Sequence, residues 1–141
     1  MTPTTDSPEP LGELFLATSR RLRRQTMEAF APLGITPHQA RTLRTVLAEG
    51  PMRLGVLAGR LRIAPRSVTD VVDSLVEAGW VARSPDPDDR RATVIEVTAA
   101  GRRQAEAVEA VRREASGRFF DAMAPADRAE LKRILGDFLA D

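Results

Sequence analysis

The fold is decided by residues 54–101, LGVLAGRLRIAPRSVTDVVDSLVEAGWVARSPDPDDRRATVIEVTAAG. In its first half, apolar residues recur at helical spacing and predict two short helices, at 54–61 and 65–78. Only three residues, 62–64, separate them. This spacing suits a helix-turn-helix, and we predict that unit here.

The second half of this stretch predicts a β-hairpin. Gly79 suits the position that follows a helix, and residues 80–84 then leave as a strand. The loop PDPDDRR combines two prolines with three acidic residues, which favours an exposed turn. The return strand at 92–97 has Ile95 and Val97 facing inward. A hairpin at this point is expected to form a wing beside the second helix.

Polar side chains gather at the N-terminal end of the predicted helix 65–78, because its apolar positions share one face. A recognition helix presents this end to base edges in the major groove. Arginine can hold guanine there, and aspartate can accept a hydrogen bond from cytosine. The base-contact candidates are Arg66, Ser67, Thr69 and Asp70. A solvated helix face is the alternative for each of them, and Asp73 fits a salt bridge better than a base contact.

Composition limits the class of protein. A chain of 141 residues with 43% hydrophobic and 29% charged residues can bury one proper core, so we expect a single domain. It lacks the apolar run of ~20 residues that a membrane span needs. Its start, MTPTTDSPEP, lacks the basic and apolar regions of a signal peptide. We therefore expect a cytoplasmic protein with no membrane partner.

The residue types argue against an enzyme. With one histidine, no cysteine and no tyrosine, general bases and nucleophiles are few, and no P-loop, GxGxxG or GxSxG motif is present. Asp86, Asp88 and Asp89 resemble part of a calcium loop, but Arg90 and Arg91 stand where glycine and further ligands are needed. We predict no metal and no cofactor.

Positive charge is concentrated just before the predicted recognition helix. Residues 19–62 contain nine arginines but only two acidic residues, whereas residues 1–18 contain three acidic residues and no basic one. Arginine binds phosphate through its forked guanidinium group. The phosphate-contact candidates are Arg53, Arg60, Arg62 and Arg83. On the hairpin tip, an exposed arginine can enter a narrow minor groove, and a second arginine beside it can hold phosphate. A purely solvated hairpin is the alternative for both.

The rest of the chain predicts helices around this unit. The elements are a flexible arm at 1–10, helices at 11–31, 36–49, 99–123 and from 125, and a short strand at 52–53. Thr36 and Thr98 are expected to cap two of the helices. Large apolar residues lie near both termini: Leu11, Leu14, Phe15, Leu16, Phe138 and Leu139. Burying one such side chain contributes roughly 1.5–3 kcal/mol, which favours a terminal bundle shared by two subunits over packing within one.

Three segments resemble the MarR family of winged helix transcription regulators: LAGRL at 57–61, SVTDVVDSLVEAGWVAR at 67–83 and DRRATVIEVTAAG at 89–101. The resemblance implies a mainly α fold with a small β wing. In the domain at 11–141, the segments 11–35 and 99–141 would form the dimerisation bundle, and 36–98 the DNA-binding lobe. It also implies a homodimer that reads a pseudo-palindrome in double-stranded DNA.

The resemblance also assigns roles to single residues. It places Arg91 in the minor groove with Asp89 fixing its side chain, and Arg90 beside it. The family often has basic residues where this chain has Asp70 and Ser74, so we expect a recognition helix that is less basic than usual. A small aromatic or anionic effector would bind a cleft whose residues are Phe30, His38, Arg41 and Thr42. For His38, an exposed or structural role is the alternative.

We therefore expect a ligand-responsive repressor that binds DNA as a homodimer. The alternative from another class is a winged helix adaptor that contacts proteins without sequence-specific DNA binding. Its support is the set of acidic residues Asp70, Asp73, Asp86 and Asp88. The loss of DNA affinity with rising salt separates the two classes.

Overall fold

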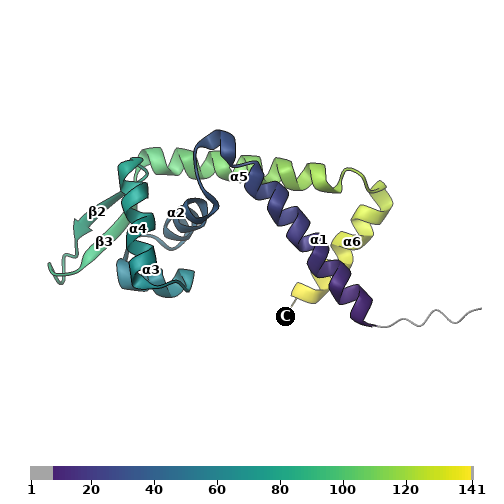
Figure 1. The fold of residues 1–141 in the computed structure, drawn as a ribbon, viewed down its shortest axis with the longest axis horizontal. Coiled ribbons are helices and arrows are strands. Elements are labelled where there is room, and N and C mark those ends of the chain that lie inside the picture. The colour runs from purple at the N-terminus through teal and green to yellow at the C-terminus, as the bar shows by residue number, and fades with distance from the viewer. Residues whose placement is uncertain (1–7, 141) are drawn as a thin grey trace, which may run out of the picture. The chain divides into compact units, whose positions relative to one another are not determined.

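The computed structural model describes residues 8–140, which are mainly helical with a small antiparallel sheet (Figure 1). The elements are α1 (Pro8–Glu28), the 3-10 helix η1 (Ala31–Leu33), α2 (Pro37–Glu49), β1 (Met52–Arg53), α3 (Leu54–Leu61), α4 (Pro65–Glu77), β2 (Val81–Pro85), β3 (Thr93–Val97), α5 (Ala99–Phe120) and α6 (Pro125–Leu139). The predicted fold class is confirmed. None of the helices in this part of the chain is long and apolar enough to cross a membrane.

Two compact units make up the fold. The first, which we call the winged lobe, is Phe30–Val111, and the second, the terminal-helix unit, joins residues 8–29 with residues 112–140. The winged lobe extends beyond residues 36–98 at both ends, and the assignment of 36–98 to DNA binding stays a prediction. Its core includes Phe30, Ile35 and Val108, which were predicted to lie in the dimerisation segments.

The core of the winged lobe is formed by α2, α3, α4 and the sheet. Its most deeply buried large side chains include Leu43 of α2, Leu57 of α3, Leu75 of α4 and Ile95 of β3. Because these apolar side chains come from different elements, their burial fixes α4 against the rest of the lobe. The exposed face of α4 is thereby held in a defined orientation.

The sheet has the strand order β1-β3-β2, and both pairings are antiparallel. Met52 pairs with Ile95, and Val81 pairs with Val97. Ile95 and Val97 are buried and Glu96 is exposed, as the alternation predicted. β2 starts one residue later than expected because the Trp80 amide donates to Leu75 O (3.0 Å) and so closes the end of α4.

Local signals explain where the helices begin and end. The Thr36 hydroxyl accepts from Gln39 N (3.2 Å), and Gln39 Oε1 accepts from Thr36 N (2.9 Å), so α2 starts with a capping box. The helix-turn-helix turn passes through Arg62, which has a left-handed φ of 55°. Gly79 takes φ 80° after α4, at the predicted position.

Two helices, α1 and α5, differ from their predicted bounds by up to three residues. α1 begins at Pro8 rather than at residue 11, because the first turn of a helix tolerates residues without an N–H; the first seven residues of the predicted arm lie outside the described part. It ends at Glu28, and the chain continues into η1. α5 ends at Phe120 rather than 123, since Met123 N donates to Phe120 O (3.0 Å) in a tighter turn.

The start of α5 lies tightly against the end of α4. Thr98 N donates to Trp80 O (3.0 Å), and the Thr98 hydroxyl donates to Gly79 O (2.6 Å). The same hydroxyl accepts from Gly101 N (3.0 Å), so Thr98 caps α5 as predicted. A Cβ on Gly101 would overlap Trp80 O, so this position requires glycine.

Candidate nucleic-acid interface

The recognition-helix candidate α4 separates a buried face from an exposed one. Val68, Val72 and Leu75 are buried in the core of the winged lobe. The four predicted base-contact residues are all exposed and lie in the first half of α4: Arg66, Ser67, Thr69 and Asp70. The Thr69 hydroxyl donates to Pro65 O (3.1 Å), within its own helix. The structure therefore brings these side chains together at the end of α4 that the sequence predicted.

Residues in the second half of α4 hold the helix in place. Asp73 forms an ion pair with Arg83 of β2, so the predicted salt-bridge role of Asp73 is confirmed. Ser74 is half-buried: its hydroxyl donates to Val71 O (2.6 Å) and accepts from Gln39 Nε2 (2.9 Å) of α2. Ser74 is therefore not part of the exposed face. The lack of a basic residue at this position does not make that face less positive.

The hairpin tip presents one strongly exposed arginine. The Arg91 side chain is 93% exposed. Asp89 Oδ1 accepts from Arg91 N (3.1 Å) and from Arg91 Nε (3.3 Å), so the carboxylate fixes both the backbone and the side chain of Arg91. Arg90 is exposed beside it. The backbone bond from Ala92 N to Asp89 O (2.9 Å) closes the tip.

The base of the hairpin is tied to β1 by an ion pair that the sequence did not predict. Arg53 Nε lies 2.5 Å from Asp86 Oδ2, and the Asp86 side chain is only 10% exposed. Asp86 Oδ1 accepts from Asp88 N (2.8 Å). The Asp88 N–H and the Arg53 guanidinium lower the pKa of Asp86, and Asp86 in turn raises the pKa of Arg53.

The four phosphate-contact candidates differ in how they are paired. Arg53 and Arg83 are held by Asp86 and Asp73 as described, and Arg60 Nε lies 3.0 Å from Glu49 Oε1. Arg62 is exposed and forms no ion pair among residues 8–140. Within the same range, no three histidine or acidic side chains are grouped so as to hold a metal ion.

The four effector-cleft candidates do not share one open surface. Phe30 and Thr42 are buried in the winged lobe, whereas His38 and Arg41 are exposed on α2. The Thr42 hydroxyl donates to His38 O (2.8 Å), so its hydrogen-bonding capacity is used within the helix. An anion could reach His38 and Arg41 without contacting the other two side chains.

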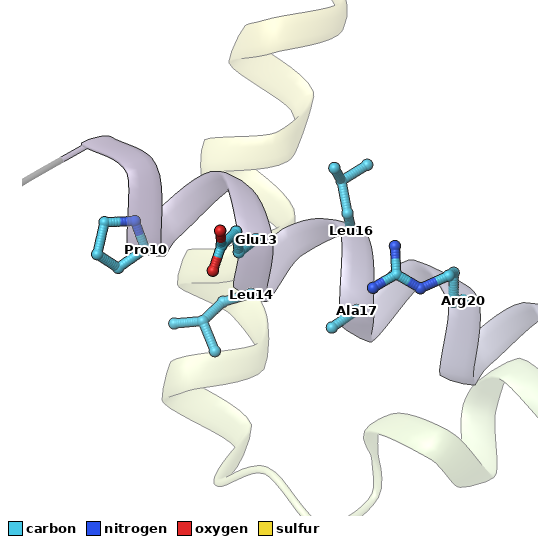
Figure 2. Close-up of a pocket in the computed structure, with 6 residues that line it drawn as sticks. All are labelled: Pro10, Glu13, Leu14, Leu16, Ala17 and Arg20. Carbon is cyan, nitrogen blue, oxygen red and sulfur yellow. The ribbon is translucent and has the colours of Figure 1, made fainter.

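The terminal-helix unit exposes large apolar side chains. Leu11, Leu14, Phe15 and Leu16 of α1 are between 54% and 69% exposed, and Phe138 and Leu139 of α6 are more than 80% exposed. A pocket lies on α1, and Figure 2 shows the side chains that line it. Its lining residues are Pro10, Glu13, Leu14, Leu16, Ala17 and Arg20. Exposed apolar surface of this extent is typical of an interaction site.

A helix-turn-helix followed by a hairpin that carries an exposed arginine defines the winged helix class. The MarR family model matches residues 35–93. The HTH-type transcriptional repressor Rv2887 of Mycobacterium tuberculosis is 31% identical over 126 residues, which cover 89% of this chain and 91% of that protein. The chain belongs to the MarR family of transcription regulators, which are not enzymes.

Solved structures agree with this assignment. Wild-type MarR of Escherichia coli in its apo form has a TM-score of 0.83 and 25% identity, covering 93% of this chain and 97% of that one. A mutant of the same protein, solved in complex with operator DNA, has a TM-score of 0.70 and 24% identity, covering 99% and 100%. At this identity the second comparison establishes the fold alone.

Proposed function

We propose that this protein represses transcription by binding a pseudo-palindromic operator in double-stranded DNA as a homodimer. One observation carries the proposal: the winged lobe contains both the exposed, polar N-terminal end of α4 and a hairpin with Arg91 at its tip. Figure 1 shows the hairpin of β2 and β3 projecting from the lobe beside α4. α4 would enter the major groove, and Arg91 would enter the adjacent minor groove.

The chemistry of the exposed residues fits this division of roles. Arg66 can donate two hydrogen bonds to guanine, and Asp70 can accept from the amino group of cytosine. Asp70 has no partner among the described residues, so its carboxylate is available for such a contact. Of the four phosphate-contact candidates, Arg62 in the turn is the best supported, because it is exposed and has no ion pair within residues 8–140. Rv2887 is named a repressor, and the E. coli structure contains operator DNA, which supports the same roles here.

We propose that a second copy of the chain buries the exposed apolar surface of α1 and α6 in a dimer interface. Each large side chain that a partner buries contributes roughly 1.5–3 kcal/mol, so several together can make the dimer the stable folded unit. A two-fold dimer presents two copies of α4, and its operator would mirror that symmetry. We also place the protein in the cytoplasm, where it can reach chromosomal DNA.

The DNA-binding proposal is tested by selecting bound duplexes from a random-sequence library and sequencing them. We expect an inverted repeat whose half-sites lie about 10 bp apart, because two recognition helices must face successive major grooves. We also expect affinity for the selected duplex to fall on the order of a thousandfold between 50 and 200 mM salt if about six phosphates are contacted. Absence of any enriched sequence would contradict the proposal.

The dimer is tested by measuring molar mass in solution. The wild type should have about twice the monomer mass of 15.4 kDa. Phe138→Glu places a charge on the exposed apolar surface of α6 and should shift the mass toward the monomer. Lys132→Glu adds an acid to the same helix at an exposed polar position and should leave the dimer intact. Equal masses for the two variants would argue against this surface as the interface.

Ligand-induced release of DNA is the remaining part of the proposal. His38 and Arg41 are exposed and three residues apart on α2, so both side chains can face one small anion. Benzoate is a suitable probe because it is both aromatic and anionic. It should weaken the wild-type complex with DNA and affect an Arg41→Gln variant less; equal effects on both would remove α2 as the site.

The adaptor alternative loses half of its support. Of its four acidic residues, Asp73 and Asp86 are paired with arginines of the same chain. Asp70 and Asp88 remain as exposed acids. Two separated carboxylates make a weak protein-binding surface, and no further observation favours this function.

A further inference from the structure

We propose that Asp86 is a positioning residue for DNA recognition: anchored by Arg53, it holds the hairpin tip in the conformation that presents Arg91. The inference rests on the proposed function, because it concerns how the wing meets DNA. It also changes the role of Arg53 from a phosphate ligand to an anchor in β1.

Asp86 connects β1 to the hairpin tip through several bonds. Its carboxylate accepts from Arg53 Nε (2.5 Å) on one oxygen and from Asp88 N (2.8 Å) on the other. Its backbone N–H donates to Ala92 O (3.0 Å) on the opposite side of the loop. Both carboxylate oxygens and the amide are therefore engaged at the base of the tip.

The hydrogen bonds of Asp86 connect through Ala92 and Asp89 to Arg91. Ala92 N donates to Asp89 O (2.9 Å), and Asp89 Oδ1 accepts from both Arg91 N and Arg91 Nε. The tip thus forms one connected set of hydrogen bonds from Arg53 to Arg91. Removing the Asp86 charge releases the set from β1, the strand that packs on the other edge of β3.

The burial and charge of Asp86 need an explanation. Among the described residues, the buried charged or polar ones are Thr42 and Asp86, and Asp86 is the charged one. A carboxylate near a DNA-binding surface weakens binding through repulsion of phosphates. Its presence at the base of the wing is understandable if the geometry that it maintains contributes more affinity than its charge removes.

The test is Asp86→Asn, because charge and geometry predict opposite results. If Asp86 merely neutralises Arg53, the variant should bind DNA more tightly, and the slope of log affinity against log salt should steepen by about 0.9 as Arg53 gains a phosphate. If Asp86 positions the wing, the variant should bind about tenfold more weakly, a loss no larger than that caused by Arg91→Ala.

The probe is a fluorescein-labelled duplex recovered by selection with the wild-type protein. Asp88→Asn is the matched control, because it removes the same charge from the same loop and the Asp88 side chain accepts no hydrogen bond there. It should bind as tightly as the wild type or slightly more tightly. Asp86→Asn made together with Arg91→Ala should bind no more weakly than Arg91→Ala alone, since the wing arginine is then absent.

The results separate the inference from the function on which it rests. The positioning role is overturned if Asp86→Asn binds DNA more tightly than the wild type. It is also overturned if Asp86→Asn weakens binding by the same tenfold when Arg91→Ala is already present. In both cases DNA binding itself stands. Failure of the wild type to bind any duplex overturns both. Circular dichroism at the assay temperature checks folding. If Asp86→Asn is unfolded, Arg53→Gln breaks the same pair and is measured in the presence and absence of Arg91→Ala.

Discussion

Replacing Gly101 by alanine is the sharpest test of how the winged lobe is assembled. Helix propensity alone predicts that alanine in α5 stabilises the fold by about 1 kcal/mol. The structure predicts the opposite, because the new Cβ would overlap Trp80 O and lie 2.8 Å from Val97 Cγ1. Real Cβ contacts essentially never fall below 3.0 Å, so the backbone must move.

That movement would break the bonds that hold the start of α5. They are Thr98 N to Trp80 O, the Thr98 hydroxyl to Gly79 O, and Gly101 N to the Thr98 hydroxyl. At about 1 kcal/mol each, their loss outweighs the gain in helix propensity and leaves a net cost of about 2 kcal/mol.

Thermal unfolding at one fixed protein concentration measures this cost, since dimerisation makes the Tm depend on concentration. For a chain of this size, about 2 kcal/mol corresponds to a drop in Tm of roughly 5–10 °C. Gly117→Ala is the control in the same helix, because nothing lies within 4 Å of its added Cβ, and it should raise the Tm. If Gly101→Ala were as stable as Gly117→Ala, the close approach of α5 to Trp80 would be refuted.

Three further predictions concern single residues. Arg62→Gly should stabilise the protein by about 1 kcal/mol in denaturant titrations, because glycine adopts a left-handed φ without strain. It should also lower the slope of log affinity for DNA against log salt by about 1. An unchanged slope would remove Arg62 as a phosphate ligand. The free energy of unfolding should fall as the pH drops from about 4 through the lowered pKa of folded Asp86, because the carboxyl of the unfolded chain takes up its proton first. Asp86→Asn should show a smaller fall. Equal pH profiles for the variant and the wild type would contradict the ion pair. Thr36→Ala should cost about 1 kcal/mol by removing the capping box of α2, whereas no change in chemical denaturation would show that the cap is dispensable.

Much of the winged lobe was predictable because its signals are local. The turn at 62–64, the glycine after α4 and the cap at Thr98 each depend on residues a few positions apart. The alternation in β3 likewise follows from the period of a strand. Periodicity was sufficient to assign the exposed end of α4, and hence the base-contact candidates, to one surface.

The pairing of charged residues was not predictable, because it depends on which strands and helices meet. Arg53 and Asp86 are 33 residues apart, and Gln39 and Ser74 are 35 apart. From the sequence, Arg53 was a candidate phosphate ligand, and Ser74 was noted only as a position where the family often has a basic residue. The order β1-β3-β2, which brings Arg53 to the base of the hairpin, is a property of the folded sheet.

Ion pairs within the chain determine which arginines are available to contact DNA. Arg53, Arg60 and Arg83 each have an acidic partner within the chain, whereas Arg62 and Arg66 are exposed without one among the described residues. Arg91 is paired with Asp89, but its side chain stays 93% exposed. Affinity should therefore come mainly from the turn, the start of α4 and the wing.

The affinity of Arg91→Ala for the selected duplex tests the central claim most directly. The Arg91 side chain is 93% exposed and its ion pair is with Asp89 of the same turn, so the variant should keep the wild-type Tm and dimer mass. Loss of its groove contact should weaken binding by about 1–3 kcal/mol. Arg103→Ala, at an exposed position of α5, should bind like the wild type. Equal affinities for Arg91→Ala and the wild type would contradict recognition of DNA through the wing.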